Sequence, residues 1–168
     1  MKVKKPRVKH LFAWILVLVM IFIVVLAWKV YGMETPLKVK SIIDGNTIVL
    51  ANGKTVGLMG INIVPGGESD LLAKQYLKSI LDGRNIWVEY TNFKGDINNT
   101  RYAWIWVGCE SRPRFLASNL SGSKENPVGC KKGALVNEQI VKMGWSEAVT
   151  PMMGERMKYQ ERMDSVEK

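Results

Sequence analysis

The longest apolar run of the chain lies near its N-terminus, where residues 11–28 include no charged side chain. As a helix extended to residue 31, this run matches the roughly 20 residues that a bilayer core requires. Basic residues gather in the tail at 1–10, and by the positive-inside rule they hold the N-terminus in the cytoplasm. We therefore predict a single transmembrane helix over 11–31. A cleaved signal peptide is the alternative, although the end of the run offers no small-residue cleavage site.

After a linker at 32–36, the pattern changes to short, partly alternating segments separated by turn-forming groups such as Asp44-Gly45-Asn46. Apolar residues then recur with helical spacing, and Gly83 suits the position that follows a helix. The predicted strands are 37–43, 47–50, 55–64, 85–90 and 101–107, and the predicted helices are 68–81, 135–143 and an optional polar helix at 153–166. This order predicts a small α+β domain.

One long segment, 108–133, is rich in glycine, serine, proline and charge where a short hairpin would suffice. Loops of this length are usually functional or disordered. A candidate partner-contact patch within it is Arg112, Arg114, Phe115 and Leu116, and the alternative is a tolerated surface insertion.

Cysteine and histidine content limits the chemistry of the domain. Cys109 and Cys130 lie near both ends of the loop, and a disulfide between them would stabilise the fold by about 3 kcal/mol. Two unpaired thiols are the alternative. The single histidine, His10, precedes the apolar run, so no zinc site and no histidine-dependent protease site is expected, and we predict no cofactor.

The net charge of +9 is unevenly distributed along the 168 residues. Residues 1–31 carry six basic side chains and no acid, so the remaining chain has a net charge of only +3. That value does not demand a nucleic-acid partner.

Three segments with the right order and spacing resemble the thermonuclease family, the staphylococcal-nuclease-like OB-fold enzymes. They are Ile43–Ile48, Val56–Asn62 and Leu135–Trp145. The resemblance covers residues 39–149 and implies a five-stranded OB-fold barrel with two to three helices. The expected domain is 37–150, followed by a C-terminal helical tail at 151–168.

The family's catalytic positions hold other residues in this chain. Phosphodiester cleavage needs a metal held by carboxylates, a general base and cations that neutralise the transition state. The second aspartate of the family's Asp-Gly-Asp-Thr motif matches Asn46, although the first is kept as Asp44. The family's two arginines match Gly57 and Thr100. The positions of its Asp-Thr-Pro-Glu motif that carry the metal ligands and the base match Asn62, Ile63 and Pro65.

These substitutions predict a catalytically inactive domain that acts as a binding or scaffolding subunit of an envelope protein complex, on the periplasmic or extracellular side of the cytoplasmic membrane. Nucleic-acid binding without cleavage is one alternative, with Arg84, Lys94, Arg101, Lys131 and Lys132 as a possible basic cluster near Trp87 and Phe93. A residual calcium-dependent nuclease is another, rebuilt from Glu68, Asp44 or Asp96. Trp104 and Trp106 share one strand face, which is either core or a binding platform, and we expect core.

Overall fold

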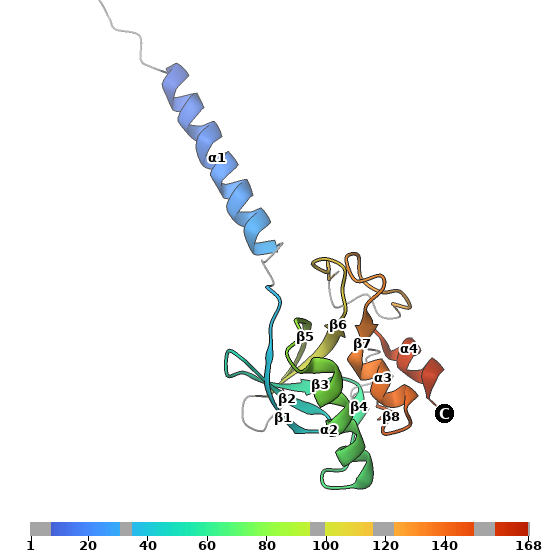
Figure 1. Cartoon of the computed structure of the whole chain (residues 1–168). Helices are drawn as coiled ribbons and strands as arrows, with labels where there is room; N and C mark the ends of the chain where they lie inside the picture. The colour runs from blue at the N-terminus through green and yellow to red at the C-terminus, as the bar shows by residue number, and fades with distance from the viewer. Residues whose placement is uncertain (1–7, 31–34, 95–99, 116–122, 150–156, 168) are drawn as a thin grey trace, which may run out of the picture. The chain divides into compact units, whose positions relative to one another are not determined.

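The computed structural model describes residues 8–30, 35–94, 100–115, 123–149 and 157–167, shown in colour in Figure 1. The chain divides into two units, Met1–Glu34 and Thr35–Lys168. Leu116, Asp96 and the start of the predicted terminal helix lie outside the described residues.

The first unit contains helix α1 (Val8–Val30), on which the described side chains from Trp14 to Val25 are apolar and exposed. Across the described part of the chain, no helix combines the length and apolar character that a membrane crossing needs. The predicted transmembrane helix, the signal anchor and the single-pass placement in the cytoplasmic membrane are therefore corrected.

The second unit is an α+β domain built around one mixed sheet. The order β1-β2-β3-β6-β5 is antiparallel except for the parallel pair β3 and β6, β7 adds to β6, and β4 and β8 form a separate two-stranded sheet. The strands are β1 (Val39–Asp44), β2 (Thr47–Leu50), β3 (Thr55–Leu58), β4 (Ile61–Asn62), β5 (Ile86–Lys94), β6 (Arg101–Val107), β7 (Ala134–Leu135) and β8 (Glu147–Ala148), and the helices are α2 (Glu68–Leu81), α3 (Val136–Lys142) and α4 (Gln160–Val166).

The sheet is not closed, so the predicted five-stranded barrel is wrong in that respect. Its edge strands, β1 and β5, are joined in the described structure by the isolated bridge between Leu37 and Ile86. Beyond that bridge α2 lies beside β1, and the Lys74 amine donates a hydrogen bond to the Ile43 carbonyl at 2.7 Å. The helix occupies the flank of β1 where a closing strand would have to pair.

The third predicted strand, 55–64, is divided in the structure into β3 and β4. Gly60 separates them with a φ of +77°, a conformation that side chains with a Cβ rarely adopt. A Cβ on Gly60 would also lie 3.1 Å from the Trp104 ring. The turn lets β4 leave the main sheet and pair with β8.

The C-terminal segment packs against the same domain. Met157, Tyr159 and Met163 are buried, and α4 lies beside α3 (Figure 1). In the predicted terminal helix, the described helical residues begin at Gln160.

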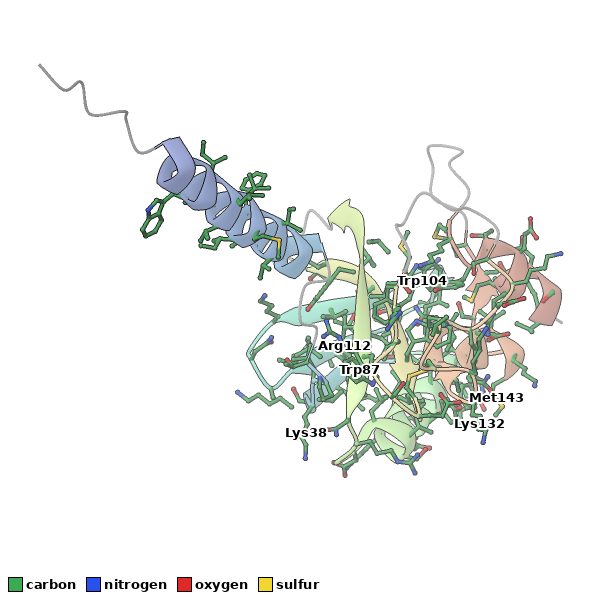
Figure 2. The ribbon with its side chains drawn as sticks, turned by 90° about the horizontal axis from the view of Figure 1, so that it is seen from above. Lys38, Trp87, Trp104, Arg112, Lys132 and Met143 are labelled. Atoms are coloured by element: carbon green, nitrogen blue, oxygen red, sulfur yellow. A yellow bond between two sulfur atoms is a disulfide. The ribbon has the colours of Figure 1, made fainter. Side chains whose placement is uncertain are left out.

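Strand β6 is the centre of the core, because both of its faces are buried from Ala103 to Val107. Trp104 lies among the crowded side chains of the domain in Figure 2. The expectation that Trp104 and Trp106 belong to the core is confirmed, with exposed fractions of 2% and 0%.

Asn137 of α3 completes the hydrogen bonding of β6 where β3 ends. Its fully buried amide donates to the carbonyls of Met59, at 2.8 Å, and Ala103, at 3.1 Å, and its oxygen accepts the Ile105 N–H at 3.0 Å. The Ala103 carbonyl also accepts the Met59 N–H at 2.9 Å, so Asn137 is needed chiefly to pair the Ile105 N–H and the Met59 carbonyl.

We expect Asn137→Ala to lower the free energy of unfolding by about 3 kcal/mol, because the buried backbone groups that bond the Asn137 amide would lose their hydrogen-bond partner. The matched control is Asn62→Ala, which removes an exposed amide and should cost less than about 0.5 kcal/mol. Urea unfolding followed by tryptophan fluorescence measures both. Equal losses in the two variants would contradict the structural role of the buried amide.

Candidate functional site

The turn between β1 and β2 holds the first pair of positions singled out by the sequence. The Asp44 carboxylate accepts the Asn46 N–H at 3.0 Å, and the Asn46 amide oxygen accepts the Thr47 hydroxyl at 2.8 Å. The Asn46 carbonyl also accepts the Leu58 N–H at 2.7 Å, which ties the turn to β3. Both polar side chains therefore have structural partners within the turn.

Gly57 lies in β3 between Thr47 of β2 and Tyr102 of β6. A Cβ at position 57 would lie 2.8 Å from Cε1 of the Tyr102 ring and 3.5 Å from the Thr100 methyl. The Tyr102 ring thus covers the space into which a side chain at position 57 would extend. The ladder and these contacts bring Asn46, Gly57 and Thr100 into one region.

The other three altered positions, Asn62, Ile63 and Pro65, lie in other parts of the domain. Asn62 pairs with Glu147 of β8, and the Ser146 hydroxyl accepts the Asn62 N–H at 2.9 Å and donates to its carbonyl at 3.0 Å. Ile63 is buried in the core, and Pro65 is exposed. A metal ligand at position 63 would have to leave the core.

Asp70 is a carboxylate at this site that the sequence reasoning missed. It is nearly buried, and its two oxygens accept the N–H groups of Gly45, at 2.5 Å, and Gly66, at 2.8 Å. One side chain therefore joins the β1–β2 turn to the loop before α2. Its only sequence signal was an acid in the first turn of a helix that follows two glycines.

The residues proposed to rebuild a catalytic site have other surroundings. Glu68 is exposed at the first position of α2. The Arg101 guanidinium stacks 4.3 Å above the Tyr90 ring, away from Thr100 as expected from strand alternation. Among the described residues, no group of three carboxylate, cysteine or histidine side chains is arranged to hold a metal ion.

A buried ion pair lies on the face of the sheet that carries Trp104 and Trp106. Glu89 of β5 forms a salt bridge with Lys158, and its other oxygen accepts the Tyr159 hydroxyl at 2.9 Å. The Tyr159 ring meets Trp104 and Trp106 edge-on, with centroids 5.2 and 5.4 Å apart. These rings are therefore covered and form no platform for stacking bases.

The loop at 108–133 is closed by the predicted disulfide between Cys109 and Cys130, which is confirmed. Asn126 organises the described part of the loop by donating to three carbonyls, those of Cys130, Lys131 and Gly133. Its amide oxygen accepts a hydrogen bond from Arg162 of α4 at 2.8 Å. The loop and the C-terminal helix are thus directly connected.

The described residues of the predicted contact patch in this loop differ in exposure. Arg112 and Arg114 are exposed, whereas Phe115 is half-buried and packs against the core. Arg114 also bridges to Val128 through the backbone.

The basic residues proposed for nucleic-acid binding lie in different surroundings. Lys131 pairs with Glu125 at 3.2 Å, and the Lys132 N–H donates to the Glu110 carboxylate at 2.5 Å. Hydrogen bonds from the backbone, first its own N–H, hold the pKa of Glu110 below its usual value. With Arg101 on the Tyr90 ring, the side chains of Lys131 and Arg101 are each held by another group of the domain.

No protein-family model and no curated protein matches this chain.

We expect Tyr159→Phe to lower the free energy of unfolding by about 2 kcal/mol near neutral pH, because the phenol donates to a charged carboxylate. Burial, and then the charge of Glu89, raises the pKa of Tyr159, while Lys158 and Arg162 also face its ring. The unfolded chain loses this proton above about pH 10, where the folded protein keeps it. Wild-type stability therefore falls above that pH, and the difference from the variant becomes smaller. Urea unfolding at several alkaline pH values tests this, and a difference that stays constant would contradict it.

We also expect Gly57→Arg to destabilise the domain by about 2 kcal/mol, because the new side chain would displace the Tyr102 ring. Gly67→Arg is the matched control, since its φ is −80° and the nearest atom to an added Cβ, the Val64 oxygen, is 3.4 Å away. Thermal unfolding compares the two. Equal losses would show that position 57 has room for an arginine.

Proposed function

We propose that Thr35–Lys168 is a catalytically inactive domain of the thermonuclease type that acts by binding a protein partner. The observation that carries the proposal is the contact between Gly57 and the Tyr102 ring. The resemblance assigns position 57 to an arginine that neutralises the transition state, and the ring fills the space that this arginine would need. The neighbouring cation position, Thr100, carries no charge.

The polar groups that remain support the same proposal. Asp44 is bonded within its own turn, and Asp70 joins two loops by accepting backbone N–H groups. Asp70 has structural partners on both of its oxygens and is therefore poorly placed to take up a metal ion as well.

Exposed apolar side chains near this region favour a protein as the ligand. Ile43, Val64 and Leu71 have exposed fractions of 49%, 76% and 56%. The bond between Lys74 and the Ile43 carbonyl places the end of β1 beside the turn of α2 that also carries Leu71. Grouped apolar exposure of this kind marks protein-binding surfaces, whereas nucleic-acid binding needs basic and stacking groups.

The disulfide is consistent with an oxidising compartment for this unit.

The test combines an activity assay with partner capture. Purified full-length protein should leave plasmid DNA intact in calcium, while cross-linking of the tagged protein in its native cells should recover a protein partner in fixed stoichiometry. Calcium-dependent cleavage that is abolished by Asp44→Asn would overturn the claim of inactivity. Recovery of the protein alone would overturn the claim of binding.

A further inference from the structure

Two limbs of the disulfide loop run side by side, and hydrogen bonds fix them to one another. The Ser111 N–H donates to the Gly129 carbonyl at 3.0 Å, and the Arg114 N–H donates to the Val128 carbonyl at 2.8 Å. The disulfide closes the same pair of limbs. The limbs therefore form a braced base for the side chains that they carry.

Gly129 allows the two limbs to approach closely. Its φ is +91°, a conformation that favours glycine, and a Cβ at this position would lie 2.2 Å from the Arg112 carbonyl oxygen. Asn126 fixes the second limb through its bonds to three carbonyls and to Arg162 of α4. Because the backbone is already held, a ligand that binds here has little loop ordering to offset.

Two arginines lie on the exposed side of the first limb. Arg112 and Arg114 are exposed, and Pro113 between them is buried, which is the alternation of an extended segment. Val128 is paired with Arg114 across the limbs, so the two side chains share one side, and 59% of the Val128 surface is exposed. We call Arg112, Arg114 and Val128 the arginine face. Its two arginines are about 7 Å apart along an extended chain.

The loop has a surplus of positive charge that its own acids do not neutralise at the arginine face. Residues 108–133 contain five basic and two acidic side chains. One acid, Glu125, forms a salt bridge with Lys131 at 3.2 Å, and the other, Glu110, accepts the Lys132 N–H. In the described structure Arg114 takes part in no ion pair. A ligand that carries negative charge would therefore complement this face.

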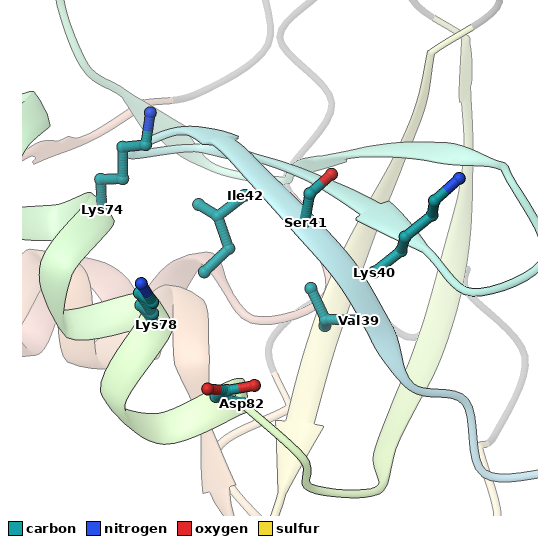
Figure 3. A pocket seen from close by; sticks show the side chains of 7 residues that line it. All are labelled: Val39, Lys40, Ser41, Ile42, Lys74, Lys78 and Asp82. Atoms are coloured by element: carbon teal, nitrogen blue, oxygen red, sulfur yellow. The ribbon is translucent and has the colours of Figure 1, made fainter.

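The groove of about 320 Å³ between β1 and α2 is also lined by lysines, but their charges do not converge (Figure 3). Lys74 and Lys78 share a helix row with the opposite charge of Asp82, and Lys40 points away from this row. Lys74 also bonds the Ile43 carbonyl, so α2 occupies the flank of β1. The arginine face is the better site for an acidic ligand, because its two charges lie on one limb and on one side of it.

The residue types of the arginine face favour carboxylates of a protein over phosphates of a nucleic acid. The planar guanidinium group donates two parallel hydrogen bonds to a carboxylate, and it is less strongly hydrated than the amine of lysine. Val128 adds an apolar contact, as at the core of protein interfaces. The single aromatic residue of the loop, Phe115, packs against the core of the domain and provides no platform on which a base would stack.

We propose that the arginine face binds an acidic segment of a partner protein, with two carboxylates at alternate positions of an extended chain. The proposal rests on the proposed function as a protein-binding domain, and it names a surface and the chemistry of the segment that occupies it. One carboxylate pairs with Arg112 and the other with Arg114. An apolar side chain of the segment packs on Val128.

The test uses the capped synthetic peptide Glu-Ser-Glu-Ser-Leu, whose only charges are the two glutamates. Full-length protein labelled with ¹⁵N is titrated with this peptide and with two control peptides. Glu-Glu-Ser-Ser-Leu keeps the composition and changes the spacing of the carboxylates, and Lys-Ser-Lys-Ser-Leu reverses their charge. The comparison of peptides uses the wild-type protein, so it stands whether or not a variant is stable.

Three double variants accompany the peptides. Arg112→Gln with Arg114→Gln removes both charges of the face, and Arg112→Lys with Arg114→Lys keeps the charges but removes the planar fork. The control, Lys54→Gln with Lys142→Gln, removes the same charge at exposed lysines outside the loop. Thermal unfolding of each variant confirms that binding is compared between folded proteins.

The peptide with alternate glutamates should shift amide signals of residues 110–115 and 126–132, and its binding should weaken as salt is raised. Its affinity should fall about tenfold in the glutamine variant, about threefold in the lysine variant and less than about twofold in the control. The peptide with adjacent glutamates should bind more weakly, and the lysine peptide should not bind. Equal affinity for the two acidic peptides, equal losses in the glutamine variant and the control, signal shifts elsewhere, or tighter binding of a single-stranded oligonucleotide would each overturn the proposal.

Capture of partners by the same variants separates this proposal from the proposed function. A partner that is lost from the glutamine variant and kept by the control, together with the peptide result, supports the arginine face. A partner kept by both overturns the arginine face and leaves the binding function standing. Absence of any partner from the wild-type protein overturns the binding function itself.

Discussion

The side chain of Asn137 is the contact on which the arrangement of the domain depends. Strand β3 leaves β6 after Leu58, although the Met59 N–H still bonds the Ala103 carbonyl at 2.9 Å. Without Asn137, the buried N–H of Ile105 would lose its partner. The amide of α3 supplies that partner and also holds the Met59 carbonyl, where the chain turns away toward β4. The position of α3, the departure of β4 and its pairing with β8 all follow from this contact.

The sequence predicted those elements whose signal is local. Helix α2 begins and ends at the predicted residues, as do β2 and β6, because an apolar stripe or an alternating pattern between turn residues determines them. The prediction of one long strand over 55–64 was wrong at Gly60. In a sequence, a glycine at which the chain turns cannot be told from a glycine within a strand. The prediction of a closed barrel was wrong because closure depends on where α2 packs against β1. The hydrophobic periodicity of either element does not indicate that position.

In the candidate site too, the sequence predicted the local features but not those that depend on tertiary packing. The six altered positions could be located by matching short motifs, but what fills the space around them could not. The nearness of Tyr102 to Gly57 comes from the parallel register of β3 and β6, between residues far apart in the chain. The roles of Asp70 and of the Glu89–Lys158 pair were missed for a related reason. Each joins segments separated by many residues, and an isolated acid or lysine in a sequence does not indicate its partner.

The bond between Asn126 and Arg162 has a consequence for where this domain ends. Arg162 also forms a salt bridge with Glu138 of α3, and Glu167 accepts the Ala148 N–H at 3.1 Å. The last described residues therefore form hydrogen bonds or a salt bridge with the disulfide loop, with α3 and with β8. A chain cut after β8 would uncover Trp104 and Trp106 and leave the Glu89 charge without its partner. The folded domain therefore extends through Glu167, and the segment predicted as a C-terminal tail contributes Met157, Tyr159 and Met163 to the core.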